Sequence, residues 1–173
     1  FSRFVRKTCE ISKYVHARVT PNLMRLFQHA FIDIPNLNLI PEPCPFPPAD
    51  AWTTFVSLPH NLNLTDEEIR NAEHIDCPAI AKYQGWRVAD RKFHVGIAWA
   101  GSTLNDIDKH RTIPVHHFFE LFRVPGVQLY ALQVGERNKD IHDAGGAPLV
   151  QDLANYLGDV ADTIGFIRQL DLV

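Results

Sequence analysis

The feature that most constrains the fold of this chain is an apolar run, Phe93–Trp99, that ends in the small residues Ala100-Gly101-Ser102. A short apolar run bounded by small residues is typical of a buried β-strand. A polar and basic loop follows, and Pro114 then predicts a helix, because proline is favoured at the first helical position. Strand, loop and helix in this order predict an α/β fold built on a parallel sheet.

The same alternation extends over the rest of the chain and predicts parallel strands joined by right-handed crossovers. Before the apolar run, we expect helices at 3–10 and from Pro21 to Ala30, and strands at Tyr14–Val19 and Trp52–Ser57. A turn at Leu58-Pro59 should follow. The capping-box pattern Thr65–Glu68 then predicts a helix at 66–73. After it, we expect helices at 114–123 and 136–143, strands at Val127–Leu132 and Pro148–Val150, a helix capped by Asp159 or Asp162 that runs to Gln169, and a fourth strand over Leu170–Val173.

A proline-rich segment interrupts the first half, because residues 35–48 hold six of the twelve prolines. Proline removes backbone donors and fixes φ, so we expect this segment to be irregular or extended. It has two interpretations: a polyproline ligand for a partner, or a segment packed against the body through Leu39, Ile40 and Phe46.

The composition narrows the class of protein. The 173 residues suffice for one domain or two small ones, and a net charge of −3 gives no reason to expect a nucleic-acid partner. No apolar run reaches the roughly 18 residues that span a bilayer, and no signal peptide is visible. Cys9, Cys44 and Cys77 are widely spaced and form no metal pair or disulfide framework, so we expect a reducing, cytoplasmic setting.

The two ends of the chain predict a fragment of a longer protein. The chain starts at Phe1, and Leu170–Val173 reads as the beginning of a buried strand. Domain boundaries prefer exposed linkers to strand interiors. An exposed sheet edge favours pairing with another chain, so we also expect a homodimer formed through that edge.

Three segments are candidates for a binding site, because each follows a predicted strand or opens a helix. The first is the loop after Trp99, where hydroxyl and cationic groups could hold a phosphate: Ser102, Thr103, Lys109, Arg111 and Thr112. The alternative is an ordinary solvated surface loop, and the spacing matches neither a P-loop nor a G-x-G-x-x-G fingerprint.

The second segment, Gln133–Glu136, could bind ribose hydroxyls through an amide or a carboxylate, or it could be a plain surface loop. The third, Asp159–Thr163, could add a helix N-terminus to the same anion site or simply cap the helix. We expect no metal site, since His116 and His117 are sequence neighbours and no H-E-x-x-H pattern occurs. No G-x-S-x-G elbow of a serine hydrolase occurs either.

The order of several motifs resembles a bacterial glycosyltransferase-like family whose members often follow tetratricopeptide repeats and are similar to ADP-heptose heptosyltransferases. The motifs are Val95–Ser102, Asn105-Asp106, Arg111-Thr-Ile-Pro114, Leu132-Gln133 before Gly135, Asp159–Thr163 and Leu170–Val173, with Val56-Ser-Leu-Pro59 upstream. Their combined order is fairly specific, whereas each motif alone is not.

The resemblance implies a GT-B architecture, in which two Rossmann-like domains face a cleft. Residues 1–75 would be the C-terminal part of the first domain, 76–92 a connector, and 93–173 the first part of the second, nucleotide-sugar-binding domain. By position, Gly101, Ser102 and Lys109–Thr112 would face the diphosphate, Gln133 the nucleoside, and Asp162-Thr163 the phosphate or sugar. The resemblance implies a nucleotide sugar as substrate and no metal cofactor, because cationic side chains and helix N-termini stabilise the leaving diphosphate.

The chain also departs from the family pattern. That pattern continues past Val173 with a strand and an Asp-Thr-x-x-x-His segment that completes the donor site, and its first domain begins earlier, with the usual position of a catalytic base. Many relatives carry Arg-Ser where this chain has Arg111-Thr112. We therefore expect a fragment of a glycosyltransferase that is not itself catalytically competent.

Two other readings are kept. The first is a non-catalytic binding or interaction module, with contacts through residues 35–48. The second is a different α/β enzyme, such as a sugar-nucleotide epimerase or a flavodoxin-like protein, although the sequence shows neither a glycine-rich first turn nor a catalytic Tyr/Lys pair.

Overall fold

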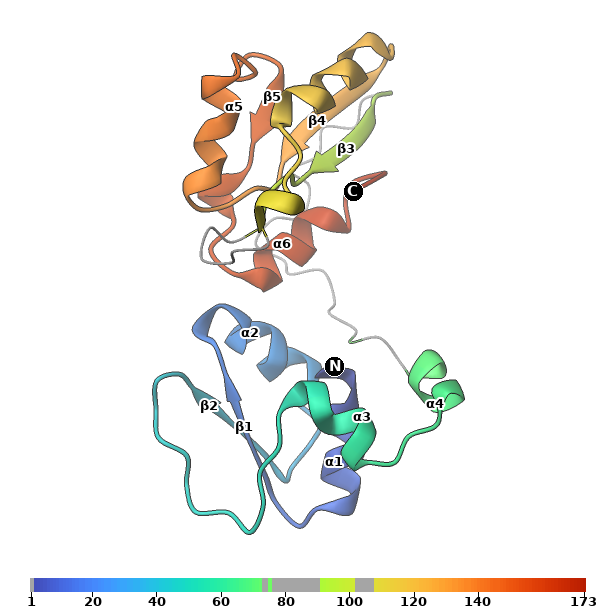
Figure 1. Ribbon diagram of the computed structural model, residues 1–173, viewed down its shortest axis with the longest axis vertical. Helices are drawn as coiled ribbons and strands as arrows, with labels where there is room; N and C mark the ends of the chain where they lie inside the picture. Colours follow the sequence, from blue (N-terminus) through green and yellow to red (C-terminus); the bar gives the residue numbers. More distant parts are fainter. Residues whose placement is uncertain (1, 73–74, 76–90, 102–107) are drawn as a thin grey trace. The chain divides into compact units, whose positions relative to one another are not determined.

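The computed structural model describes residues 2–72, 75, 91–101 and 108–173. The chain divides into two compact units, Phe1–Pro78 and Ala79–Val173, and each is described by itself. Both units are of the α/β type and contain small parallel sheets (Figure 1). The predicted fold class is confirmed at this level, whereas most of the predicted connector at 76–92 lies outside the described residues.

The first unit is built on two parallel strands, β1 (Val15–Val19) and β2 (Leu37–Pro41), whose register places Val15 opposite Leu37. Parallel strands need a crossover connection, and α2 (Pro21–Ala30) supplies it, with Pro21 in its first turn as predicted. A 3₁₀ turn, η1 (Ser2–Phe4), leads into α1 (Val5–Ile11). The core of this unit contains Phe4, Val5, Cys9, Ala17, Val19, Leu26, Phe27, Phe31, Ile40 and Leu58.

The proline-rich segment contributes β2 and then continues without regular structure through residue 54. Ile40 is buried, and the Arg18 guanidinium lies 4.2 Å from the centre of the Phe46 ring. These contacts favour packing against the body of the unit over a free polyproline ligand.

The predicted strand at Trp52–Ser57 is wrong. Phe55–Ser57 forms a 3₁₀ turn, η2, and the predicted turn that follows is α3 (Leu58–Asn61). Thr54 starts η2 because its hydroxyl accepts a hydrogen bond from the Ser57 backbone N–H. Local capping thus outweighs the β-propensity of this segment, since side-chain hydrogen bonds of this kind compete with strand pairing.

The predicted helix after Thr65 is confirmed as α4 (Asp66–Asn71), which ends two residues earlier than expected. The capping box is complete: Thr65 Oγ1 accepts from the Glu68 N–H, and Glu68 Oε2 accepts from the Thr65 N–H at 2.8 Å. These two bonds satisfy donors that every helix leaves unpaired in its first turn.

The second unit contains a parallel sheet in the order β3 (Phe93–Ile97), β4 (Val127–Ala131), β5 (Val150–Asp152). Leu172 also pairs in parallel with Val95, whose other neighbour is Leu129 of β4. The chain therefore adds strands on one side of β3 and then returns to its other side. The predicted fourth strand appears only as this single bridge, with Gly96 N–H bonded to the Leu172 carbonyl at 2.9 Å.

Helices cover both faces of this sheet. One face packs against η5 (Val115–Arg123) and α5 (Asp140–Asp143), and its core contains Val95, Ile97, Trp99, Val115, Leu129, Ala131, Ile141 and Val150. The other face packs against α6 (Val160–Ile167), with Tyr130, Leu132, Leu153 and Phe166 between them. With right-handed crossovers, a sheet that reverses its direction of growth must move the next helix to the opposite face, as observed.

Most predicted elements of this unit are confirmed, with small shifts. The helix after Pro114 is 3₁₀ in type, and Pro114 is its N-cap rather than its first residue. The predicted helix at 136–143 is divided into η6 (Glu136–Lys139) and α5, and the third strand begins at Val150. Asp159 is the cap of α6, because its carboxylate accepts from the Asp162 N–H at 2.8 Å.

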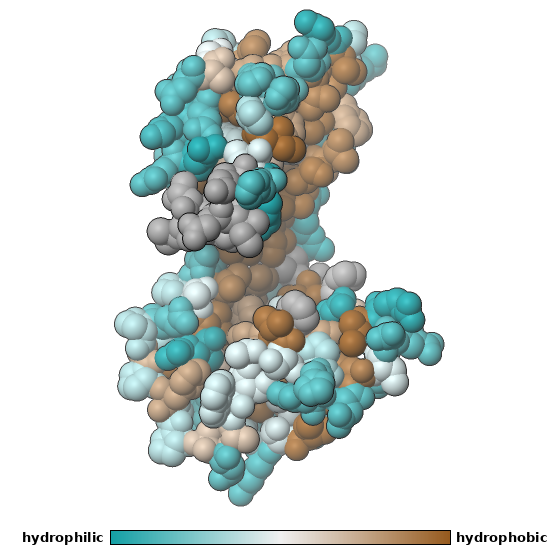
Figure 2. Space-filling view, in the orientation of Figure 1, coloured by the Kyte–Doolittle hydropathy of each residue, from teal (hydrophilic) through white to brown (hydrophobic). Residues whose placement is uncertain are grey.

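The surface of the second unit differs from side to side. Figure 2 shows hydrophilic side chains over α5 and apolar side chains along the side where β3 and β4 lie. Exposed apolar residues near the open edge of the sheet include Phe93, Leu172 and Val173. Pairing of this edge with a second copy stays a prediction. No described helix is both long enough and apolar enough to cross a membrane.

At Gly96, β3 packs against the side chains of Leu132 and Leu170, which follow β4 and α6 in the chain. A Cβ at this position would lie 2.6 Å from Leu170 Cδ1 and 2.8 Å from Leu132 Cδ1. We expect Gly96→Ala to destabilise the second unit by about 1–3 kcal/mol through overpacking. Hydrogen exchange of the β4 amides measures the free energy of opening of this unit alone.

The matched control is Gly165→Ala in α6, where a Cβ would meet no atom within 4 Å. That substitution should stabilise the helix by about 0.5–1 kcal/mol, because alanine loses less backbone entropy than glycine. Equal exchange in Gly96→Ala and the wild type would contradict the packing described here.

Candidate functional site

The candidate site lies where β3, β4 and β5 end, at the carboxyl edge of the second sheet. This edge is distinct from the open edge beside Leu172, at which a further strand could pair. In open parallel sheets, ligands bind beyond the carboxyl ends of the strands, at the point where the strand order reverses. Here the order reverses at β3, between β4 and the bridge to Leu172. The carboxyl end of β3 is therefore the position where a ligand site is expected (Figure 1).

Gln133, which follows β4, holds the end of β3. Its Oε1 accepts hydrogen bonds from two backbone amides, Trp99 N–H at 3.1 Å and Ala100 N–H at 3.0 Å. Its Nε2 donates to the Val134 carbonyl at 3.3 Å, and the residue is buried. In this arrangement both ends of the Gln133 amide are paired within the chain, so its observed role is to fix the path of the chain after β3.

Trp99 is fixed a second time through its side chain. The indole N–H donates to Asp140 Oδ2 at 3.1 Å, and Arg137 Nε lies 3.2 Å from the same oxygen. Trp99 is buried on the face covered by η5 and α5. The end of β3 is thereby tied to the first residues of α5 as well as to Gln133.

Asp108 closes the loop after β3. Its Oδ1 accepts from the Gly101 N–H at 2.8 Å, and its Oδ2 accepts from the Thr112 hydroxyl at 3.0 Å. Its backbone carbonyl also accepts from the Arg111 and Thr112 N–H groups. Gly101 leaves room for this contact, because a Cβ there would lie 2.5 Å from Asp108 Oδ1.

The cationic groups predicted for a phosphate site belong to this loop. Arg111 is exposed and follows η4 (Asp108–His110). The predicted carboxylate, Glu136, is also exposed and is the first residue of η6, beyond β4. Ser102, Thr103 and the side chain of Lys109 lie outside the described residues. The structure thus brings the segments that carry Arg111 and Gln133 to one edge, with the hydroxyl of Thr112 turned to Asp108.

The start of α6 lies beyond β5 and on the other face of the sheet. Asp162 is buried, and its Oδ2 accepts from the Gly158 N–H at 3.1 Å. The Thr163 hydroxyl donates to the Asp159 carbonyl at 3.2 Å. These bonds give Asp159 and Asp162 capping roles; a contact of Asp162 or Thr163 with a phosphate or sugar stays a prediction.

Asp152 forms a further link on the same edge. Its Oδ2 accepts from Asn138 Nδ2 and its Oδ1 from the Ala154 N–H, both at 2.8 Å. Sequence reasoning missed Asp108, Asp140 and Asp152. Their carboxylates accept hydrogen bonds from backbone and side-chain donors near the ends of the strands. For Asp108 a signal was present, since Asp is favoured at turns and a Thr follows four residues later.

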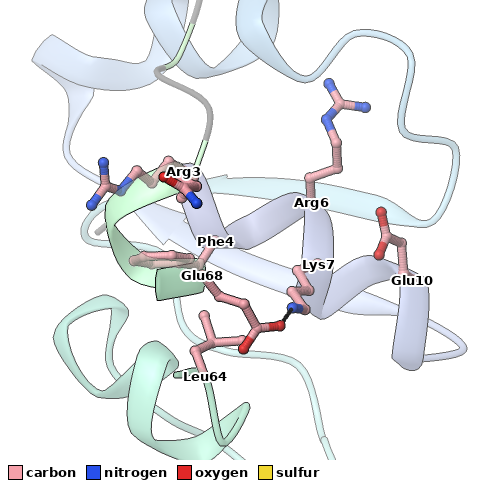
Figure 3. Close-up of a pocket in the computed structure, with 9 residues that line it drawn as sticks. Arg3, Phe4, Arg6, Lys7, Glu10, Leu64 and Glu68 are labelled. Carbon is pink, nitrogen blue, oxygen red and sulfur yellow. Dashed lines mark hydrogen bonds and ion pairs between the residues drawn. The ribbon is translucent and has the colours of Figure 1, made fainter. Parts of the chain in front are cut away.

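A second concave region lies in the first unit, where α1 and α4 enclose a pocket of about 420 Å³ (Figure 3). Three of its charged residues, Arg3, Arg6 and Lys7, bind groups of the same unit. Lys7 Nζ donates to Glu68 Oε1 at 2.7 Å, as Figure 3 shows, and Arg3 donates to the Ile69 carbonyl at 2.8 Å. Arg6 points away from the pocket and binds the Asp33 carboxylate through two hydrogen bonds. Lys7 and Glu68, which line this pocket, connect α1 with α4.

Comparison of the chain with protein-family models, with curated proteins and with solved structures gave no match. The fold and the geometry of the site are thus the observations from which function must be argued. Among the described residues, no group of three or more His, Cys, Asp or Glu side chains could hold a metal ion.

Gln133→Leu tests the clamp on β3. The substitution leaves the Trp99 and Ala100 amides without their acceptor, which should cost about 1–3 kcal/mol of stability. Hydrogen exchange at these two amides should become faster than in the wild type. Gln151→Leu on the exposed side of β5 is the control, and equal protection in all three proteins would contradict the clamp.

The Lys7–Glu68 pair predicts a pH dependence of the first unit. Hydrogen bonds from Lys7, and then from Thr65, lower the pKa of Glu68 from 4.5 to about 2. Because the folded-state pKa is depressed, the stabilisation is fully present above pH 4.5 and is lost as the pH falls towards 2. Urea denaturation at a series of pH values should show a smaller loss over this range for Glu68→Gln than for the wild type.

Glu67→Gln is the control for this experiment, since it removes the same charge from the same helical turn. It should retain the pH dependence of the wild type. If Glu68→Gln and Glu67→Gln behave alike, the pair does not hold α4 on α1.

Proposed function

We propose that this chain is part of a GT-B-type glycosyltransferase and that its second unit carries the half-site for the diphosphate of a nucleotide sugar. The first unit would be the C-terminal part of the other Rossmann-like domain. The proposal rests on the motif order in the sequence together with the parallel α/β architecture of both units.

One observation carries the proposal: the described residues on either side of the loop after β3 are held by side chains, at the strand where the sheet reverses direction. Gln133 and Asp108 hold this loop at its start and at its end. Ligands of open α/β sheets bind at such a reversal.

In the proposed reaction, sugar transfer from the nucleotide donor releases a nucleoside diphosphate. Lys109 and Arg111 would neutralise the negative charge that develops on this leaving group, and the N-terminus of α6 would add its dipole. The acceptor and the catalytic base are not assigned to residues of this chain.

Ligand-observed NMR tests the proposal, with UDP, GDP, ADP and their sugar conjugates as probes. Saturation transfer to one of these nucleotides is expected with the full chain. The double variant Lys109→Ala/Arg111→Ala should lose it, since about 1.5–3 kcal/mol is typical of each hydrogen bond to a charged group.

The matched control is Lys92→Ala/Arg123→Ala. It removes the same charge, but Lys92 precedes β3 and Arg123 ends η5, so both belong to the opposite edge of the sheet. Transfer should persist in this control. Absence of transfer to every nucleotide in the wild type would overturn the proposal and favour a non-catalytic interaction module.

A further inference from the structure

We propose that Asp108 is a positioning residue of the nucleotide site, which it serves by holding the loop after β3 without contacting the ligand itself. This inference rests on the proposed function. It concerns a residue that the motif comparison did not assign, and it follows from four hydrogen bonds made by one buried side chain and its carbonyl.

The two partners of the Asp108 side chain suit a carboxylate, because each of its oxygens accepts a hydrogen bond. Gly101 N–H donates to one of its oxygens and the Thr112 hydroxyl to the other. Asp108 is only 8% exposed, and a buried carboxylate needs such donors to offset the loss of hydration. An asparagine could keep both contacts only if the Thr112 hydroxyl changed from donor to acceptor, and both bonds would then lose the charge of the carboxylate, which makes such bonds stronger.

Asp108 therefore sets the distance between the two ends of the loop. Gly101 immediately follows the Gln133 clamp, and Thr112 stands next to Arg111, whose own N–H is bonded to the Asp108 carbonyl. Once Gly101 and Arg111 are held by the same residue, the backbone that carries Arg111 has a fixed position relative to the end of β3.

The hydrogen bonds to Gln133 and Asp108 also determine which backbone N–H groups remain available to bind an anion. The amides of Trp99, Ala100 and Gly101 all donate to side-chain acceptors, namely Gln133 and Asp108. In the P-loop, by contrast, consecutive backbone amides cradle the phosphate. Because these three described amides are already paired, the proposed contact with the diphosphate comes from the exposed side chain of Arg111, and nucleotide affinity depends on where Asp108 places it.

The direction in which nucleotide affinity changes when Asp108 is replaced distinguishes a positioning role from a purely electrostatic effect. Removal of a negative charge near an anion site should tighten anion binding by Coulomb's law. Loss of a positioning contact should weaken it. We expect Asp108→Asn to weaken binding of the nucleotide identified in the screen by about tenfold, as the loss of one charge-assisted hydrogen bond would.

Asp152→Asn is the matched control, because Asp152 also accepts two hydrogen bonds at the same edge of the sheet. It makes the same chemical change and should lower thermal stability to a similar degree. Its nucleotide affinity should equal or exceed that of the wild type. Isothermal titration of the three proteins, with thermal unfolding measured in parallel, gives both quantities.

A second pair of variants covers the case in which Asp108→Asn does not fold. Thr112→Val removes only the hydroxyl that donates to Asp108, whereas Thr112→Ser keeps it. The serine variant should bind the nucleotide more tightly than the valine variant.

The outcomes are distinguishable. If the wild type binds a nucleotide but Asp108→Asn or Thr112→Val binds it equally well, Asp108 has no positioning role and the proposed function stands. Weaker binding that Asp152→Asn shows to the same extent would likewise overturn the inference. If the wild type binds no nucleotide, the proposed function fails and the inference fails with it.

Discussion

Parallel pairing of β3 on both of its sides is the constraint on which the rest of the second unit depends. β4 pairs with one side and Leu172 with the other. Because parallel neighbours must be reached by crossovers, this central position places η5 and α5 on one face and α6 on the opposite face. It also leaves the loop after β3 as the segment that departs from the point of reversal.

Side chains, not further backbone pairing, complete that edge of the sheet. Strand ends leave N–H groups without ladder partners, and unpaired buried donors are costly. Gln133, Asp140, Asp108 and Asp152 accept from such groups or from nearby side chains. Polar residues therefore connect the strand ends at this edge, and three of the predicted site residues, Gly101, Thr112 and Gln133, belong to the same network.

The sequence predicts elements well where the signal is local. The capping box at Thr65, Pro21 in a first helical turn and the apolar run at β3 all specify their structure within a few residues. The segment at Trp52–Ser57 was mispredicted, because alternation and aromatic content suggest a strand while a side-chain bond from Thr54 stabilises a 3₁₀ turn. Within the candidate site, Arg111 and Gln133 are predicted from their places after strands, and their contact with a ligand stays a prediction. Asp108 was not predicted as a site residue, because its partners, Gly101 and Thr112, come close to its side chain only when the chain is folded.

The capping of α4 has a consequence for how the first unit folds. Glu68 closes the capping box with one oxygen and accepts from Lys7 of α1 with the other. Helices this short are not stable in isolation, so the six residues of α4 gain their structure together with their attachment to α1. Winding of this helix and its docking are thus a single cooperative event, and any change that frees Glu68 from one role weakens it in the other.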